Sequence, residues 1–179
     1  MKHWKKLKES FVYQGYRNIL RKTFALPHGK EVDFDIIDVP SFVCIAALTD
    51  KNQVLLVDQY RPGPEICMLS FPEGRIDPGE EAEVAVQREL REETGYQAQE
   101  IKFLKSIPHA YSNQSKIIYL ALGCQLVSEQ ELDEHEFIDV LLMDIPQFKH
   151  LLLDPQHRAC NSIDAGYLLL HYLEKGNSL

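Results

Sequence analysis

The order of apolar and polar residues predicts strands in the first part of the chain. Between residues 31 and 36 apolar and acidic side chains alternate strictly, which is typical of a strand with one face in water. Apolar residues at 19, 20, 24 and 26 lead into it through a turn with proline and glycine at 27–29. We therefore expect a small antiparallel sheet within residues 11–37. The basic, polar residues 1–10 are expected to form a frayed tail.

The middle of the chain contains strands that the pattern places inside the protein. Residues 42–48, FVCIAAL, form a continuous apolar run, which indicates a strand covered on both faces. A polar turn at 50–52 separates this run from a second one at 54–57. Three more apolar stretches predict further strands, at 101–107, 117–122 and 137–143.

Two helices are expected toward the C-terminal end. Asp144 can cap the first of them, because a proline follows in the first turn and Gln147 stands where a reciprocal capping contact is made. This helix should end at Asp154-Pro155, and a second should run from about 162 to 174. No internal repeat, low-complexity linker or second domain is indicated.

A segment near the centre of the chain is predicted to be a helix whose inward side carries acids. Turn residues at 74–79 precede a helical pattern at about 80–94, and Gly95 is placed to end the helix in the left-handed conformation. At about 100° per residue the apolar side chains form one arc. These side chains are Ala82, Ala85, Val86 and Leu90. Glu89 and Glu93 fall in the middle of that arc.

Ionised carboxylates on an inward face need a partner. Arg88 can pair with Glu92 one turn on, but this leaves Glu89 and Glu93 without an obvious basic neighbour on the helix. Burial of unpaired charge is costly, and like charges one turn apart repel each other. A divalent cation would offset both the burial of charge and the repulsion. Carboxylate ligands favour Mg²⁺, or Mn²⁺ in its place, over zinc. Such ions keep positions open for phosphate oxygens, so the segment predicts a metal–phosphate site.

The same segment resembles the Nudix box, the sequence motif of the Nudix hydrolases. Its defined positions are occupied by Gly74, Glu80, Arg88, Glu89, Leu90, Glu92, Glu93, Gly95 and Tyr96. The resemblance implies an α/β fold, an α/β/α sandwich with a mixed sheet, in which the motif forms a loop, a helix and a loop. It also implies a magnesium-dependent hydrolase that cleaves a diphosphate linked to another moiety. Glu89 and Glu93 would hold the metal, with Glu92 as a further ligand or as the partner that fixes Arg88.

Features outside the motif are similar to the Nudix enzymes that hydrolyse ADP-ribose and related nucleotide sugars. Two subunits of those enzymes exchange a small N-terminal sheet, which residues 1–40 resemble. The resemblance implies a homodimer, with dimerisation strands at 1–40 and a catalytic domain at 41–179. ADP-ribose would give AMP and ribose 5-phosphate. Another nucleotide sugar such as GDP-mannose, or a dinucleotide, is the alternative substrate; a nucleotide sensor without activity is a second alternative, which the intact motif disfavours.

Further site residues are expected before and after the helix. Arg61 ends a strand in a QYR element; in the ADP-ribose enzymes this arginine contacts substrate, and its position alone also allows a surface salt bridge. The resemblance gives the Glu73 backbone carbonyl a place in a metal site, and Arg75, at the mouth of the loop, is expected to contact the sugar or terminal phosphate. It draws the catalytic base and an extra metal ligand from Glu134 and Glu136, which alternate in an extended acidic segment. Which of the two has which role is left open.

The loop at 108–114 departs from the pattern of the ADP-ribose enzymes. Those enzymes often have Ser-Pro-Gly followed by an acid, whereas this chain has His109-Ala110-Tyr111 and no acid in the loop. The departure leaves the exact substrate open. His109 could act as a base because its unperturbed pKa lies near neutrality, although an ordinary loop histidine is the more frequent case.

Composition excludes several other classes of function. The 179 residues are 45% hydrophobic and 26% charged, as in a globular domain. A net charge of −8 argues against binding of nucleic acid, while a bound metal still allows an anionic substrate. The four cysteines are scattered, so neither a zinc site nor a disulfide framework is expected. No apolar stretch follows the basic N-terminus or reaches membrane-spanning length, and we expect a cytoplasmic protein without a membrane partner.

Overall fold

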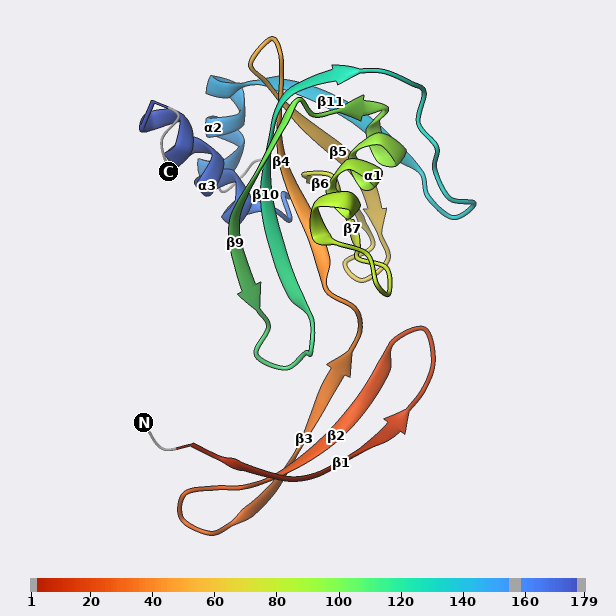
Figure 1. Cartoon of the computed structure of the whole chain (residues 1–179), viewed down its shortest axis with the longest axis vertical. Coiled ribbons are helices and arrows are strands. Elements are labelled where there is room, and N and C mark those ends of the chain that lie inside the picture. Colours follow the sequence, from red (N-terminus) through yellow and green to blue (C-terminus); the bar gives the residue numbers. More distant parts are fainter. Residues whose placement is uncertain (1–2, 155–158, 177–179) are drawn as a thin grey trace. The chain divides into compact units, whose positions relative to one another are not determined.

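The computed structural model describes residues 3–154 and 159–176 (Figure 1). The chain divides into two compact units, Met1–Ser41 with Ile107–Lys116 and Phe42–Ser106 with Ile117–Leu179. The sequence predicted a boundary at residue 40 and placed residues 107–116 in the catalytic part, whereas the structure groups them with the N-terminal strands. The assignment of dimerisation to one part and catalysis to the other stays a prediction.

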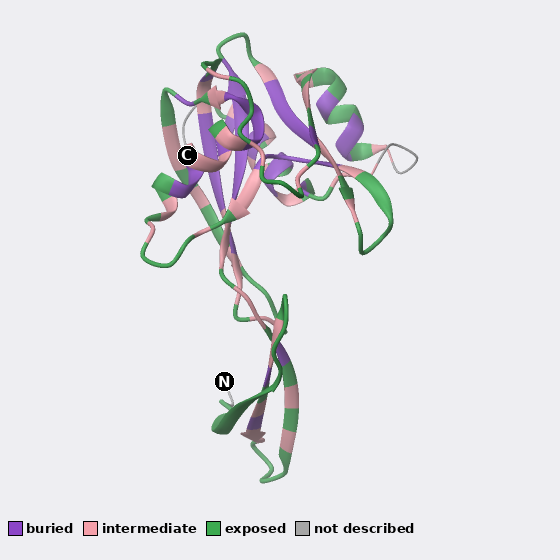
Figure 2. Cartoon of the chain, turned by 90° about the vertical axis from the view of Figure 1, so that its right-hand side faces the viewer, coloured by how far each residue is buried: buried purple, intermediate pink, exposed green. Residues whose placement is uncertain are grey.

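Three antiparallel strands form the sheet of the N-terminal unit. They are β1 Lys5–Tyr13, β2 Asn18–Ala25 and β3 Glu31–Asp38, in the order β1-β2-β3. The expected sheet is confirmed, but the expectation of a frayed tail is wrong from Lys5 onward. Every residue of β1 is exposed (Figure 2), so β1 has no buried face that a sequence pattern could show. It is a strand because its backbone pairs with β2; residues 1 and 2 lie outside the described part.

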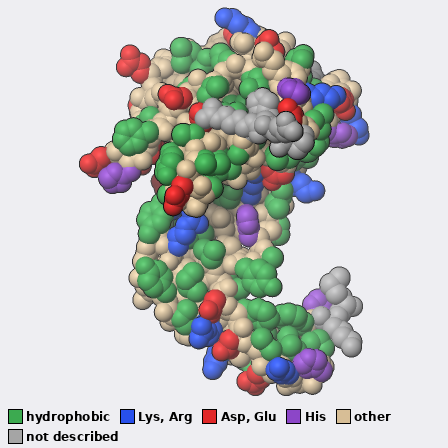
Figure 3. All heavy atoms as spheres, turned by 180° about the vertical axis from the view of Figure 1, so that it is seen from behind, with side chains coloured by type: hydrophobic (Ala, Val, Ile, Leu, Met, Phe, Trp, Pro, Cys, Tyr) green, Lys and Arg blue, Asp and Glu red, His purple; other side chains and the backbone are tan. Residues whose placement is uncertain are grey.

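A cluster of aromatic rings holds this small sheet. Trp4 stacks on Phe34 with ring centroids 5.4 Å apart, and Phe24 meets the two rings edge-on at 6.1 and 6.0 Å. Tyr111, on the segment 107–116, lies 6.5 Å from Phe34. Trp4 is nevertheless 51% exposed, and Figure 3 shows hydrophobic side chains gathered at the surface of this unit.

The second unit is built on one mixed sheet. Its strands are β4 Phe42–Thr49, β5 Gln53–Arg61, β6 Ile66–Ser70, β7 Glu73–Arg75, β8 Tyr96–Gln97, β9 Glu100–Pro108, β10 Ser115–Leu126 and β11 Ile138–Asp144. Their order is β11-β5-β4-β10-β8, with β6 paired to β5, β7 to β4 and β9 to β10. β5 is antiparallel to β4, β6 and β11, whereas β4 and β10 run in the same direction (Figure 1). The strands predicted from the apolar runs are all confirmed, with shifted ends.

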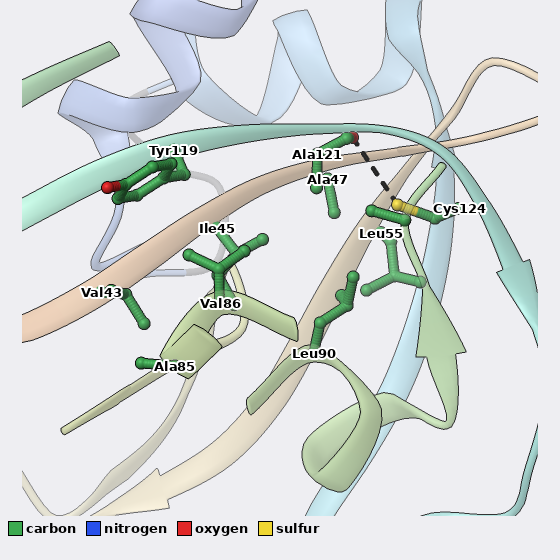
Figure 4. Close-up of a cluster of buried hydrophobic side chains, with 11 residues drawn as sticks. Val43, Ile45, Ala47, Leu55, Ala85, Val86, Leu90, Tyr119, Ala121 and Cys124 are labelled. Atoms are coloured by element: carbon green, nitrogen blue, oxygen red, sulfur yellow. Dashed lines mark hydrogen bonds between the residues drawn. The ribbon is translucent and has the colours of Figure 1, made fainter. Parts of the chain in front are cut away.

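Helices cover both faces of this sheet. They are α1 Ala82–Thr94 on one face, and α2 Ile145–Leu153 and α3 Ile163–Glu174 on the other (Figure 1). Alternate residues of β4, namely Val43, Ile45 and Ala47, join apolar side chains of α1 in one buried cluster (Figure 4). Near α2, Phe71 meets Phe148 with ring centroids 5.6 Å apart. The expected α/β/α sandwich is therefore confirmed.

Helix α1 begins two residues later than expected, at Ala82 rather than Glu80. Glu80 belongs to the preceding turn, where its N–H donates to the Asp77 carbonyl at 3.0 Å and its carboxylate accepts from the Asp77 N–H at 3.0 Å. Gly95 ends the helix as expected. It has a φ of 77°, and its N–H donates to the Arg91 carbonyl at 2.7 Å.

The C-terminal helices agree with the capping pattern. Asp144 is the N-cap of α2, and its N–H donates to the Gln147 side-chain oxygen at 3.4 Å. The predicted end of α2 agrees with the C-cap at Asp154, and Pro155 lies outside the described residues. In the described part of the chain, no helix is long and apolar enough to cross a membrane.

Candidate active site

Strand β7 brings the loop before α1 against the helix. It pairs with β4, with Gly74 opposite Val43. A Cβ atom on Gly74 would lie 1.9 Å from the carboxyl carbon of Glu89, so any other residue there would displace this carboxylate from its position. The backbone of β7 and the Glu89 carboxylate are therefore in direct contact.

Arg88 lies at the centre of a group of acids. Its Nε and Nη2 donate to the two Glu80 oxygens, both at 2.9 Å, and its Nη1 donates to Glu89 at 2.7 Å and to Glu92 at 3.0 Å. Nη2 also donates to the Arg75 carbonyl at 2.9 Å. The Arg88–Glu92 pair is confirmed. The expectation that Glu89 has no basic neighbour is wrong, because the guanidinium fork reaches several oxygens at once.

Glu93 is a buried carboxylate on the inward face of α1, where the helical pattern placed it. Glu93 is 4% exposed, and its Oε2 accepts a hydrogen bond from the Glu73 N–H at 2.9 Å. Burial raises the pKa of Glu93 well above its usual value; the Glu73 N–H opposes the rise, and the charges of Glu89, Glu73 and Glu136 add to it. The protein therefore holds an acid where a negative charge is costly.

Glu89 lies in a similar environment. Its side chain is 13% exposed, and burial raises its pKa, while the hydrogen bond and the charge of Arg88 lower it. The charges of Glu92 and Glu136 raise it further. Several acids thus share one partly dry region, an arrangement that suits a cation.

The two acids expected from the segment before β11 differ in position. Glu136 is half-buried, and its carboxylate accepts from the Asp133 N–H at 3.2 Å. Its charge raises the pKa of both Glu89 and Glu93, whereas Glu134 is exposed. The structure therefore brings Glu136, rather than Glu134, to the acids of α1.

Arg61 and Arg75 lie beside the loop that precedes α1. Arg61 Nη2 is 2.9 Å from Glu73 Oε1, and the two side chains are 30% and 12% exposed. Asn161 Nδ2 reaches the same oxygen at 3.5 Å. Arg61 is thus held in an ion pair, and its contact with substrate stays a prediction. Arg75 is exposed, and its role also stays a prediction.

Comparison with known proteins identifies the family. The sequence model of the NUDIX domain matches residues 39–161. The chain belongs to the Nudix family. A solved structure described as the crystal structure of ADP compounds hydrolase is similar to this Nudix protein with a TM-score of 0.84 and 25% identity, over 99% of this chain and 98% of that one.

Several curated proteins are similar to this chain in sequence, and two of the three described here are named for ADP compounds or ADP-ribose. This Nudix protein is 32% identical to the ADP compounds hydrolase NudE of Escherichia coli (strain K12) over 133 residues, 74% of this chain and 71% of that protein. It is 33% identical to the ADP-ribose pyrophosphatase of Bacillus subtilis (strain 168) over 119 residues, 65% of this chain and 64% of that protein. It is 31% identical to the methanol dehydrogenase activator of Bacillus methanolicus over 125 residues, 68% of each chain.

The acids of this Nudix site fit a hard divalent cation by their chemistry. All are oxygen donors, and a cation would offset both the burial and the mutual repulsion that raise the pKa values of Glu89 and Glu93. Within residues 3–154 and 159–176, no three His, Cys, Asp or Glu side chains are grouped so that they could hold an ion as they stand. Arg88 instead holds one oxygen each of Glu89 and Glu92, so these carboxylates would share their oxygens between Arg88 and a bound metal.

Two residues of the Nudix site were not predicted from the sequence. Asn161 contacts the Glu73 side chain, and Gln130 donates to the Glu93 carbonyl at 2.6 Å. Each of these residues is far along the chain from the residue that it contacts, and such a long-range contact leaves no pattern in the neighbouring sequence. The only signal for Gln130 is that it is the single amide in the acidic run EQELDEHE.

The Arg88–Glu80 pair should make this Nudix fold sensitive to acid. The hydrogen bonds from Arg88 and from the Asp77 N–H lower the pKa of Glu80 from 4.5 to about 2. The stability from this carboxylate is therefore complete above pH 4.5 and lost as the pH falls toward 2. Glu80→Gln should lower the urea midpoint near neutral pH and flatten its fall in that acid range, measured by circular dichroism.

The control for this experiment is Glu83→Gln. Glu83 is exposed in the first turn of α1, so its replacement should leave the acid slope unchanged. Equal slopes for the wild type and Glu80→Gln would contradict the prediction.

Proposed function

We propose that the protein hydrolyses the pyrophosphate bond of a nucleoside diphosphate sugar with magnesium, and that ADP-ribose is the substrate. The observation that carries the proposal is Glu93, an acid buried against the Glu73 N–H beside the charges of Glu89 and Glu136. Such an acid costs stability unless a cation binds it. The choice of substrate is supported by the relatives named ADP compounds hydrolase and ADP-ribose pyrophosphatase.

The acids would hold the metal and Arg88 would hold the acids. The proposed ligands are Glu89, Glu92, Glu93 and the backbone carbonyl of Glu73, with Glu136 as a further ligand in the scheme in which Glu134 is the base. Mg²⁺, or Mn²⁺ in its place, would neutralise charge on the diphosphate oxygens and favour the attack of water on phosphorus. Arg88 keeps the side chains of Glu89 and Glu92 oriented in the same region.

The remaining residues would move the proton and bind the substrate. Glu136 accepts a proton from the attacking water, with Glu134 as the alternative base. The water oxygen bonds to one phosphorus as the bridging P–O bond breaks, and the electron pair of that bond leaves with the other phosphate. One water is consumed, and AMP and ribose 5-phosphate are formed. Arg61 and Arg75 would bind phosphate or sugar oxygens of the substrate.

An assay of a substrate panel tests the proposal. The protein is incubated with magnesium and ADP-ribose, GDP-mannose or a dinucleotide, and the products are separated by chromatography. ADP-ribose should have the highest kcat/KM, and EDTA should stop the reaction. If another substrate is cleaved faster, that compound replaces ADP-ribose as the proposed substrate. Another nucleotide sugar or a dinucleotide is the second candidate, because the loop at 108–114 lacks the acid that ADP-ribose enzymes often have. Nucleotide binding without cleavage of any substrate would indicate a sensor.

Association of two copies through the N-terminal unit is part of the proposal. Exposed β1 and the exposed ring of Trp4 support it, because apolar surface of this kind often marks an interface. Light scattering of the full chain should give the mass of two copies, and the mass of one copy would contradict the dimer.

A further inference from the structure

The last turn of α1 is capped by the segment that follows β10. The last four carbonyls of a helix have no partner within it. Here the Glu92 carbonyl accepts from the Glu131 N–H at 2.9 Å, and the Gly95 carbonyl accepts from the N–H groups of Val127 and Ser128 at 2.9 and 3.2 Å. The 127–137 loop is therefore attached to the end of the helix that carries the Nudix box acids.

The side chain of Gln130 joins this loop to two other places. Its Nε2 donates to the Glu93 carbonyl at 2.6 Å and to the Ile138 carbonyl at 3.1 Å. Glu93 lies in the last turn of α1, and Ile138 is the first residue of β11. One amide group thus connects the start of the loop with the helix and with the far end of the loop.

Apolar packing contributes little to the position of this loop. Thr94 and five residues within 126–132 line an open hollow of about 580 Å³. Leu126, Val127 and Phe137 are 66%, 54% and 80% exposed. Figure 1 shows the loop as a long connection between β10 and β11. With few buried apolar contacts, hydrogen bonds have a larger share in ordering the loop than they have in the core.

We infer that Gln130 is a positioning residue, whose amide fixes the 127–137 loop, and Glu136 with it, against the C-terminal end of α1. Its effect on catalysis rests on the proposed function, because that function assigns Glu136 to the reaction. Gln130 does not contact the reacting atoms in this scheme. It acts through the loop.

Gln130→Glu tests the inference, because it keeps the shape of the side chain and replaces the two donated protons with an acceptor. Amides of the 127–137 loop should exchange with deuterium about tenfold faster, as expected for the loss of hydrogen bonds of this kind. Amides of β4 and β5 should exchange as in the wild type. The kcat for ADP-ribose should fall about tenfold or more, with KM changed less than about twofold.

Two further variants separate charge from hydrogen bonding. Gln130→Leu removes the donors without adding a charge and should behave as Gln130→Glu does. Gln125→Glu is the matched control, because Gln125 is an exposed amide of β10 that donates to Asp50 at 3.1 Å. Gln125→Glu should leave loop exchange and kcat unchanged.

Each outcome decides a separate point. If the backbone amides of the loop exchange with deuterium at the wild-type rate in both Gln130 variants, the Gln130 amide does not hold the loop. Faster loop exchange with the kcat of the wild type would show that the loop is held without positioning a catalytic group, which also overturns the inference. Absence of hydrolysis by the wild type would count against the proposed function, and loop exchange would still decide whether Gln130 holds the loop.

Discussion

Glu93→Gln should lower the turnover of ADP-ribose at least about 100-fold in magnesium, because loss of an outer partner of a metal ligand already costs about 10–100-fold. Glutamine keeps an oxygen that can accept from the Glu73 N–H, which lies 2.9 Å from Glu93 Oε2 in the wild type. It has no negative charge to offer a cation. The loss of turnover should therefore occur in a protein that remains folded.

The same substitution should leave stability unchanged or raise it when no metal is bound. Burial and neighbouring charges raise the pKa of Glu93 well above its usual value, so at neutral pH an ionised Glu93 opposes folding. A neutral glutamine removes that cost, and the Tm in EDTA should equal or exceed that of the wild type. Magnesium should raise the Tm of the wild type, because it binds the folded state, and should change the Tm of Glu93→Gln very little.

Scanning fluorimetry with magnesium or EDTA, combined with kinetics, measures both effects. Glu83→Gln serves as the control, since Glu83 is an exposed acid on the same helix, and it should keep the turnover of the wild type. Wild-type turnover by Glu93→Gln in magnesium would show that the metal assignment is wrong. A large drop of its Tm in EDTA would show that Glu93 has a structural role instead.

The helix and the direction of its acids could be predicted because both depend on near neighbours along the chain. Helical spacing alone places Glu93 on the side of Val86 and Leu90, and all three are buried. The start of the helix was predicted less well. The sequence pattern includes Glu80 in the helix. In the structure its side chain accepts from Arg88 and from the Asp77 N–H, and its backbone forms the turn that precedes the helix.

Partners set by the tertiary fold could not be predicted. β1 is held by backbone pairing with β2, which requires no apolar face, so its exposed residues resemble a tail. Arg61 could be marked as a candidate from its position, but its ion pair with Glu73 depends on the pairing of β6 with β5 and of β7 with β4. Gln130 lies in an acidic run whose sequence says nothing of the helix end that it contacts.

Arg88→Met should lower stability and turnover together. The guanidinium donates to the carboxylates of three acids; the Arg88 side chain is 26% exposed, and those of the acids are 12%, 13% and 31% exposed. Removal of one partner from fully buried ion pairs costs about 3–5 kcal/mol; with this partial exposure we expect about 2–3 kcal/mol. The Tm should fall by roughly 5–10 °C. Turnover should fall about 10–100-fold, because Glu89 and Glu92 lose the group that orients them.

Arg91→Met is the matched control for this change. Arg91 lies on the same helix, is 50% exposed and is 3.8 Å from a single acid, Glu131, that is 60% exposed. Exposed pairs of this kind contribute about 0–1 kcal/mol, so Arg91→Met should unfold close to the wild type in urea. A similar loss of stability in the two variants would show that the acids around Arg88 are not the cause.

A double variant decides whether the loss comes from charge. If Arg88→Met destabilises the protein because carboxylates are left facing one another, Glu80→Gln in that background should return part of the lost stability. If the loss comes from the packing of the arginine stem, the two effects should add. Urea unfolding of the wild type, both single variants and the double variant gives the coupling energy directly. A coupling near zero would mean that Arg88 supports this helix through its aliphatic carbons, and that the acids of the Nudix box need no guanidinium to hold them before metal binds.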